Sequence, residues 1–359
     1  MITPSFWSGK RVFVTGHTGF KGSWLSLWLH RLGAHVTGYA LPPPTQPALF
    51  ELARIPELIT SIQGDVTDAA AVEAALIAAR PEIVIHLAAQ TLVRYSYEAP
   101  IETIRTNVLG TAHVLDAIRR VPSVRAVVVI TSDKCYYNEE WPWGYREEDR
   151  LGGDDPYSAS KAAAEMVVAT YQHSYFAKKH GAAAPALAST RAGNVIGGGD
   201  WTRDALIPDI LRSLLKGEPT VIRSPKATRP WQHVLEPLHG YLTLAEHLYE
   251  RGHEFATSWN FGPPETSERS VAWIIDTIYR LWGTDMKWIR DTVPGPPENM
   301  LLKLDSSKAR HYLGWRPKLD LPTSLAWIVD WTRRYQSGAD VRATTLADID
   351  RFMTLAPPA

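Results

Sequence analysis

The sequence has almost no cysteine. Cys135 is the only one in 359 residues, which excludes a disulfide within the chain and any site built from several cysteines. The histidines are scattered, without the spacing of a metal site, so we expect no metal. Cys135 itself is predicted to be a small buried residue rather than a nucleophile, because free cysteine is among the most buried residue types.

Net charge and long apolar runs are also missing. Lysine plus arginine and aspartate plus glutamate number 38 each, so no basic field favours nucleic acid or an anionic membrane as partner. No apolar run reaches the roughly 20 residues that a membrane-spanning helix needs. Near the N-terminus, Lys10 and Arg11 lead directly into a strand-like run, without the apolar segment of a secretion signal. We therefore expect a cytoplasmic protein.

Short β-branched runs alternate with helical patterns through the first half of the chain. The alternation predicts an α/β fold with a Rossmann-like, doubly wound parallel sheet. Beyond Asn194 the pattern becomes irregular, so we divide the chain into a first domain, 1–193, and a smaller C-terminal lobe, 194–359, some of whose segments return to the first domain. The predicted strands are 11–15, 34–39, 59–64, 83–87, 124–130 and 187–191, and the longest predicted helices are 100–119 and 157–179.

A glycine-rich loop joins the first predicted strand to the first helix. Glycines at every third position allow a tight turn and close backbone approach, and the following helix N-terminus favours a pyrophosphate. In this context the spacing predicts a dinucleotide site formed by Gly16, His17, Thr18, Gly19, Phe20, Lys21 and Gly22.

The second predicted strand ends without the acidic residue that often binds the ribose of NAD. His17 and Lys21 instead place potentially cationic groups near the phosphates, so nothing would repel a 2′-phosphate. We expect NAD and do not exclude NADP. Asp65 either binds the adenine amino group or caps a turn.

Two groups of residues have the chemistry of a redox reaction on a hydroxyl. Tyr157 and Lys161 lie one helical turn apart on the same face. A tyrosine beside a fixed ammonium loses its proton more easily than its reference pKa of about 10 allows, and can then take a hydroxyl proton. Ser132, Asp133 and Lys134 follow the predicted strand 124–130 and add an acid and a second charge. The combination suggests oxidation coupled to a further step.

These residues together resemble the extended short-chain dehydrogenase/reductase family, especially its nucleotide-sugar-modifying members. The finer similarity is to the CDP-glucose dehydratases, in which Lys134 replaces the glutamate of the dTDP- and GDP-sugar enzymes. The resemblance implies that the first domain binds NAD(P), that the C-terminal lobe binds a nucleotide sugar, expected to be CDP-glucose, and that further cofactor contacts come from Val66, Leu87, Ala88 and Ala89. The segments that carry it are 16–22, 65–66, 86–90, 107–111, 131–136, 157–161, 191–195, 197–201 and 229–234.

The resemblance implies loss of water from C5 and C6 of the sugar by internal hydride transfer. Tyr157, supported by Lys161, would remove the C4 hydroxyl proton, and Ser132 would hydrogen-bond the C4 oxygen. Asp133 would protonate the departing C6 hydroxyl. Two roles stay open for Lys134, as a neutral base at C5 or as a cation that stabilises the enolate.

Other positions are candidates for substrate contact. A guanidinium fork suits phosphate oxygens, so Arg203 and Arg229 are predicted to bind the pyrophosphate, with surface ion pairing as the alternative. Asn107 is expected to order the active-site helix and a water chain, with simple bonding to the backbone as the alternative. Contacts with the sugar or its pocket are predicted for Gln90, Arg94, Asn194 and Glu298.

Related enzymes form four-helix dimer interfaces through helices equivalent to 100–119 and 157–179, so the resemblance implies a homodimer or homotetramer. A 4-epimerase or another nucleotide-sugar dehydratase of the family remains an alternative, although an epimerase would leave Asp133 and Lys134 idle. A non-catalytic dinucleotide-sensing regulator is the alternative of a different class, and it would not need an activated phenol.

Overall fold

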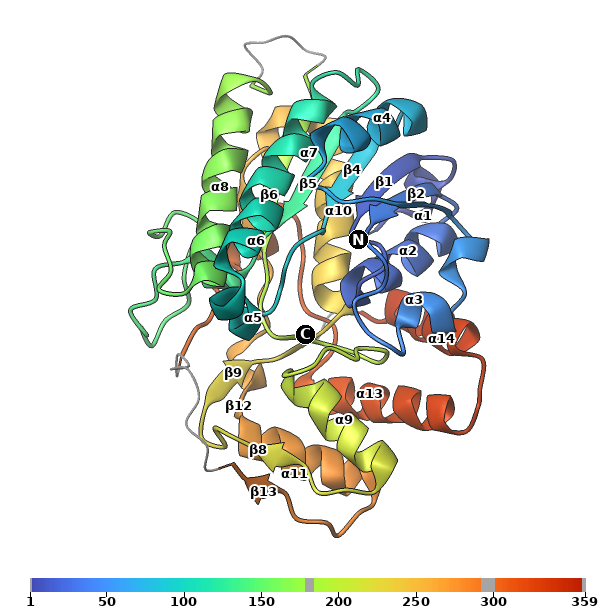
Figure 1. Cartoon of the computed structure of the whole chain (residues 1–359), viewed down its shortest axis with the longest axis vertical. Helices are drawn as coiled ribbons and strands as arrows, with labels where there is room; N and C mark the ends of the chain where they lie inside the picture. The colour runs from blue at the N-terminus through green and yellow to red at the C-terminus, as the bar shows by residue number, and fades with distance from the viewer. Residues whose placement is uncertain (1, 178–183, 292–300, 357–359) are drawn as a thin grey trace.

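The main layer of the protein is a seven-stranded parallel sheet with the order β11-β6-β5-β4-β1-β2-β3. The computed structural model describes residues 2–177, 184–291 and 301–356 (Figure 1). The sheet confirms the predicted doubly wound α/β fold. Its strands are β1 Arg11–Thr15, β2 His35–Ala40, β3 Thr60–Gln63, β4 Ile83–His86, β5 Ala126–Ile130, β6 Ala186–Arg191 and β11 Ser258–Asn260.

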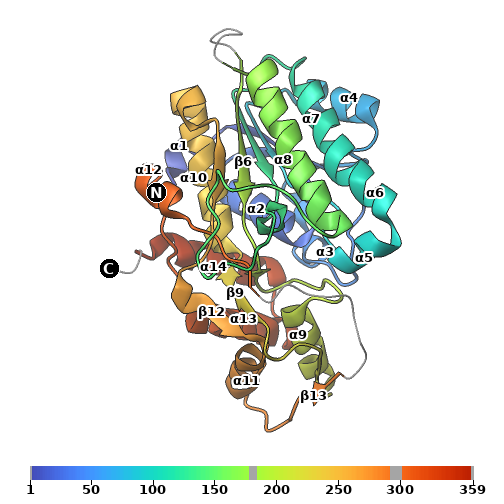
Figure 2. The same ribbon diagram turned by 90° about the vertical axis from the view of Figure 1, so that its left-hand side faces the viewer.

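Both faces of the sheet are covered by helices. Side chains alternate along a strand, so in β1 Val12 and Val14 join one buried apolar cluster while Phe13 joins another. The first cluster contains α2 Phe20–Arg31 and α10 Leu235–Arg251, and the second contains α4 Ala69–Ala79, α7 Gly110–Ile118 and α8 Pro156–Ser174. Figure 2 shows α7 and α8 on one side of the sheet and α10 on the other.

A smaller lobe occupies the lower part of Figure 1. Amphipathic helices pack their apolar faces around a third buried cluster: α9 Leu206–Lys216, α11 Val271–Trp282 and α13 Leu321–Gln336. Three two-stranded sheets complete it, pairing β7 Val195–Ile196 with β10 Gln232–His233, β8 Val221–Ile222 with β13 Ile289–Arg290, and β9 Thr228–Pro230 with β12 Glu268–Ser270.

The sheet layer also includes segments from the second half of the chain. Two segments beyond residue 194, β11 and α10, belong to the sheet layer. The remaining α-helices are α1 Pro4–Trp7, α3 Leu49–Leu52, α5 Val93–Glu98, α6 Pro100–Ile104, α12 Ser307–Tyr312 and α14 Val341–Thr354. None of the described helices combines the length and apolar character that crossing a membrane requires.

Two predicted elements differ in detail. The region 100–119, predicted as one α-helix, is α6, a π-helical turn Arg105–Leu109, and α7. The helix predicted over 157–179 is α8, whose first turn is capped by Asp155, because its Oδ1 accepts the Ser158 N–H at 2.9 Å. The sequence analysis missed β11, since a three-residue strand shows no periodicity.

Candidate active site

A cavity of about 1360 Å³ lies between the sheet layer and the smaller lobe, at the carboxyl ends of the parallel strands. This edge is where open α/β sheets hold their ligands. The volume exceeds the roughly 300–1,000 Å³ typical of one drug-sized ligand, so there is room for a dinucleotide and a second molecule. The predicted site residues that line it are Gly16, Thr18, Gly19, Phe20, Lys21, Gly22, Asp65, Val66, Leu87, Ala88, Ala89, Gln90, Ser132, Asp133, Lys134, Tyr157, Lys161, Asn194, Arg203 and Arg229.

The glycine loop is packed so closely that side chains would not fit at Gly16 and Gly22. Gly16 has a φ of 74°, and a Cβ there would lie 2.7 Å from the Ala88 nitrogen. A Cβ on Gly22 would lie 2.1 Å from the Gly16 carbonyl oxygen. The backbone is therefore pressed between β1 and β4 while the N-terminus of α2 faces the cavity. This is the arrangement that binds a pyrophosphate.

The prediction of a cationic His17 near the phosphates is wrong. The ring is fully buried and lies outside the cavity lining, with Nε2 2.7 Å from Ser61 Oγ. It occupies the space beside Gly38, where an added Cβ would lie 2.3 Å from the ring. Burial lowers the pKa of His17 to about 4, so the ring is neutral at physiological pH.

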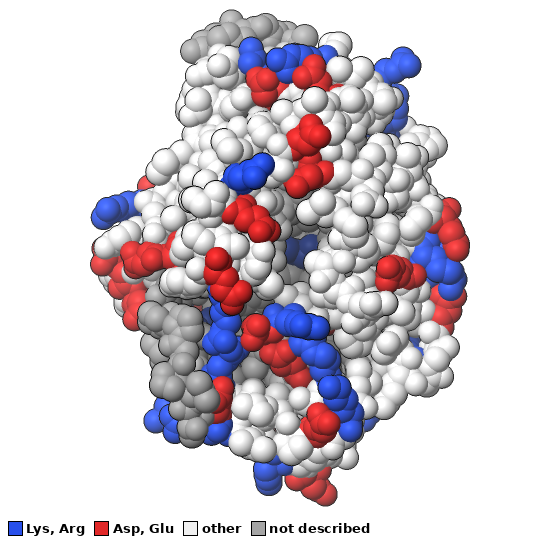
Figure 3. Space-filling model, viewed as in Figure 1, with Lys and Arg blue, Asp and Glu red and all other residues white. Residues whose placement is uncertain are grey.

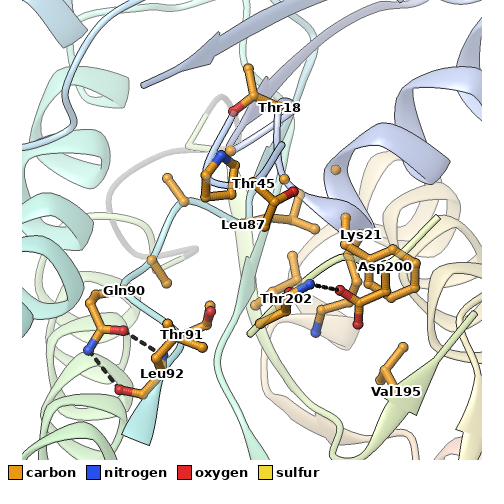
Figure 4. A pocket seen from close by; sticks show the side chains of 18 of the residues that line it. Thr18, Lys21, Thr45, Leu87, Gln90, Thr91, Leu92, Val195, Asp200 and Thr202 are labelled. Atoms are coloured by element: carbon orange, nitrogen blue, oxygen red, sulfur yellow. Dashed lines mark hydrogen bonds between the residues drawn. The ribbon is translucent and has the colours of Figure 1, made fainter. Parts of the chain in front are cut away.

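Lys21 does line the cavity, beside residues that the sequence analysis missed. Burial lowers the pKa of Lys21, while the negative charges of Asp133 and Asp200 act in the opposite direction. Figure 4 shows Lys21 and Asp200, whose carboxylate accepts the Thr202 N–H at 3.0 Å. Asp200 and Thr202 lie in irregular chain after β7, where no periodic pattern marks them.

The position of Asp65 is compatible with both predicted roles, a contact with the adenine amino group and a turn cap. Its Oδ1 accepts the Thr67 N–H at 2.8 Å, which is the bond of a turn. The residue also lines the cavity. No acidic residue ends β2, but Glu51 of α3, which follows the proline-rich loop after β2, lines the cavity as Asp65 does.

Tyr157 and Lys161 lie on the first turns of α8 and are nearly closed off, with 7% and 5% of their surfaces exposed. Contrary to the prediction, the pKa of Tyr157 is raised. Burial is the largest cause, a hydrogen bond with Ser132 opposes it, and the Asp133 charge adds to it. The pKa of Lys161 falls to about 7, mainly through burial and then through the positive charge of Lys21. Desolvation therefore outweighs the help that the ammonium was expected to give the phenol.

A short 3₁₀ turn, Asp133–Cys135, follows the end of β5, and Ser132 is its N-cap. Ser132 Oγ donates to Asp133 Oδ1 at 3.0 Å and accepts the Lys134 N–H at 3.2 Å. Asp133 is packed against the backbone of Gly193, where an added Cβ would lie 1.7 Å from Oδ2. The cavity thus brings together an acid and the Tyr157–Lys161 pair from two separate elements.

Asn107 holds the segment after β4 against α8, as part of its predicted ordering role. Its Oδ1 accepts the Gln90 N–H at 2.8 Å, and its Nδ2 donates to the Gln90 carbonyl and to Ser160 Oγ at 2.9 and 2.8 Å. The Gln90 side chain donates to Leu92 O at 3.1 Å, as Figure 4 shows, and to Thr103 Oγ1 at 2.9 Å. Gln90 is therefore fixed at the cavity wall.

Arginines surround the entrance to the cavity. Figure 3 shows lysine and arginine side chains, interleaved with acidic groups, around the hollow between the two parts of the molecule. Arg203 and Arg229 line the cavity, but Arg94 does not, and its Nη1 lies 3.9 Å from Asp204. Arg94, predicted to contact the sugar, therefore lies outside the cavity lining. Glu298 lies outside the described residues.

Comparison with known proteins identifies relatives along nearly the whole chain. The family model described as GDP-mannose 4,6 dehydratase matches residues 13–326. A protein from Salmonella typhimurium named CDP-glucose 4,6-dehydratase is 51% identical over 358 residues, 99% of each chain.

Solved structures share the fold. A dTDP-glucose 4,6-dehydratase from Streptomyces venezuelae with NAD bound superimposes with a TM-score of 0.77, at 22% identity over 92% of this chain and 99% of the other. A UDP-glucose 4-epimerase from Thermus thermophilus in complex with NAD gives 0.76, at 26% identity over 90% and 99%. The chain belongs to the NAD-dependent epimerase/dehydratase family, within the extended short-chain dehydrogenases/reductases.

Proposed function

We propose that the protein is a 4,6-dehydratase that converts CDP-glucose into CDP-4-keto-6-deoxyglucose and water. One observation carries the reaction type: a single cavity contains both the Tyr157–Lys161 pair and the acid Asp133. The 51% identity to a CDP-glucose 4,6-dehydratase over 99% of both chains supports the nucleotide.

The glycine loop and the N-terminus of α2 would hold the cofactor. NAD held there would supply the hydride acceptor for C4 and the hydride donor for C6 of the sugar, and the NAD bound to the related structures supports this choice over NADP. Gly16 and Gly22 allow the loop to pack closely against the segment after β4 and against the start of α2. Val66 and Ala88 line the same region of the cavity.

The chain's own residues move the protons. Tyr157 acts as a phenolate, and the positive charge of Lys161 must offset the burial that raises the Tyr157 pKa. The phenolate takes the C4 hydroxyl proton and becomes a neutral phenol, while Ser132 hydrogen-bonds the C4 oxygen. The C4 ketone acidifies C5–H, whose proton leaves with the help of Lys134. Asp133 gives its proton to the C6 hydroxyl, and the C6–O bond breaks to release water. When hydride is returned to C6, C5 takes back a proton, and the proton that Tyr157 took from the C4 hydroxyl balances the one that Asp133 gave up. The sugar is therefore neither oxidised nor reduced overall.

The experiment that tests this function is mass spectrometry of the product formed from CDP-glucose with a catalytic amount of NAD, run beside dTDP-, GDP- and UDP-glucose. We expect loss of one water from CDP-glucose without net production of NADH. An unchanged mass with a rearranged sugar would instead establish an epimerase. Binding of NAD without turnover of any of the sugars would establish the regulator.

We also propose that the protein forms a homodimer through α6 and α8. Large apolar side chains of α6 and α8 are more than two-fifths exposed: Ile101, Ile104 and Met166, at 70%, 43% and 56%. Figure 2 shows α6, α7 and α8 side by side on that surface. Light scattering coupled to size-exclusion chromatography should give twice the chain mass of 40.0 kDa, and Ile101→Lys should lower it to the mass of one chain.

A further inference from the structure

A buried ion pair lies directly behind the cavity. Arg191 Nη2 is 2.8 Å from Glu165 Oε2, and the two side chains are only 3% and 2% exposed. Neither residue lines the cavity. Removing two charges from water costs about as much as their attraction returns, so a buried pair is weak evidence for stability. Its position therefore needs another explanation.

The pair binds both flanks of the segment that carries the acid. On one flank, the Thr131 hydroxyl donates to Glu165 Oε1. On the other, Arg191 Nη1 donates to the Tyr136 hydroxyl at 2.6 Å, and that hydroxyl donates to Asn260 Oδ1 at 2.8 Å. Thr131 and Tyr136 are 4% and 1% exposed, so water does not substitute for these bonds.

The same pair belongs to the elements that carry the rest of the site. Glu165 follows Tyr157 and Lys161 along α8 at successive intervals of four residues, which places all three on one helix face. Arg191 ends β6, two residues before Gly193, whose backbone packs against Asp133. Although burial opposes ionisation, the charge and hydrogen bond of Arg191 keep the pKa of Glu165 below its usual value. The link between α8 and β6 is thus a charged one.

We propose that Glu165 and Arg191 are positioning residues that fix the segment Ser132–Lys134 relative to Tyr157 and Lys161, and so couple oxidation at C4 to loss of water from C6. The proposal rests on the dehydratase function. Oxidation needs only α8 and the nucleotide-sugar site, whereas elimination needs the acid at a defined distance from the same sugar. A displacement of about 1 Å can cost on the order of 10²-fold in rate, so loosening either flank should slow elimination selectively.

The test removes the flanking bonds without leaving a buried charge. Thr131→Val deletes the bond to Glu165 Oε1, and Tyr136→Phe deletes the hydroxyl that Arg191 and Asn260 share. Ser189→Ala is the matched control, because Ser189 Oγ donates to Glu165 Oε2 at 2.7 Å but lies in β6, away from the acid segment. Each variant is assayed with CDP-glucose and NAD. We measure the rate of water loss. In quenched samples we also measure the fraction of sugar that is oxidised at C4 but still carries its C6 oxygen.

We expect both flank variants to lose water roughly 10-fold or more slowly than the unaltered protein and to accumulate the oxidised, undehydrated sugar. The KM for CDP-glucose should stay within about 2-fold. The control should keep the original ratio of dehydrated product to sugar that is oxidised but not dehydrated. Equal partition in all three variants, or an equal loss of oxidation and elimination, would overturn the proposal. Failure of the unaltered protein to dehydrate CDP-glucose would instead overturn the proposed function.

Hydrogen exchange gives a readout that needs no substrate. The Lys134 and Cys135 N–H groups bond within the segment, to Ser132 Oγ and Ser132 O at 3.2 Å each. A peptide covering residues 131–137 should exchange faster in Thr131→Val and Tyr136→Phe and at the original rate in Ser189→Ala. Unchanged exchange in both flank variants would show that the ion pair does not hold the segment.

Discussion

The two halves of the active site are built differently. Tyr157 and Lys161 lie on a regular α-helix of 19 residues, capped by Asp155. Asp133 and Lys134 lie on a three-residue 3₁₀ turn after β5 that Ser132 caps, and the flanks of this segment depend on partners from α8, β6 and β11. In the proposed reaction, oxidation depends on the element that forms from local sequence. Elimination depends on the element that only tertiary contacts define.

The largest effect is expected at the helix. Tyr157→Phe keeps the ring but removes the hydroxyl that takes the C4 proton, so both half-reactions should stop together. We expect turnover of CDP-glucose to fall by roughly 10²- to 10⁴-fold, with no oxidised sugar in quenched samples. Oxidised sugar at the original level would show that Tyr157 is not the base.

A substitution at Asp133 should separate elimination from oxidation. Asp133→Asn keeps the shape of the side chain but cannot supply a proton to the C6 hydroxyl. Water loss should fall by roughly 10²-fold or more, while sugar oxidised at C4 accumulates on the enzyme. Parallel loss of oxidation and elimination would contradict the division, and folding is checked by comparing the thermal midpoint with that of the unaltered protein.

A smaller effect of the same kind is expected from the backbone that supports the acid. In Gly193→Ala the new methyl group would lie 1.7 Å from Asp133 Oδ2, so the carboxylate must move. We expect elimination to slow by about 10-fold, with oxidation nearly unchanged. Gly217→Ala is a control for backbone strain, because Gly217 has a φ of 71° with no neighbouring atom within 4 Å of the added Cβ. Gly217→Ala should lower stability without changing the ratio of dehydrated to oxidised sugar.

A substitution away from both halves should change stability alone. Burial raises the pKa of Glu236 to about 7, against the opposing N–H bonds from Leu319 and Lys318. The unfolded group has a pKa of about 4.3, so between these values the folded chain holds a proton that the unfolded chain has released. The contribution of Glu236 to stability is therefore complete below about pH 4 and is lost as the pH rises through about 7.

Glu236→Gln removes this titration. Between pH 4 and pH 8 the unaltered protein should lose on the order of 3 kcal/mol of unfolding free energy relative to the variant. Urea denaturation at a series of pH values measures this difference. Parallel pH profiles would show that the group ionises normally.

Local pattern was sufficient to predict much of the fold and of the cofactor loop. The strands, the Gly16–Gly22 loop and the Tyr157/Lys161 spacing are features of contiguous sequence, and the cavity brings them to one edge of the sheet. The short strand β11 and the π-helical turn at Arg105–Leu109 have no periodic pattern of their own. They form because neighbouring elements supply their partners.

The errors at the site concern the direction and environment of side chains. His17 has the right position for a phosphate-binding cation, but the open space beside Gly38 takes its ring into the core. Lys161 stands one turn from Tyr157 as expected, yet burial dominates the pKa of both residues. The contact of Asp133 with Gly193 joins the turn after β5 to the loop after β6, and no local pattern in a single sequence reveals it.

The solitary thiol has a practical consequence. Cys135 is completely buried, and burial raises the pKa of its thiol well above the ordinary value. The native thiol of the folded chain should therefore react little with thiol reagents. A cysteine introduced on the surface can then carry a fluorophore or spin label without removal of any native residue. Because Cys135 directly follows Lys134, slow labelling of the native thiol would time the opening of the acid-bearing turn.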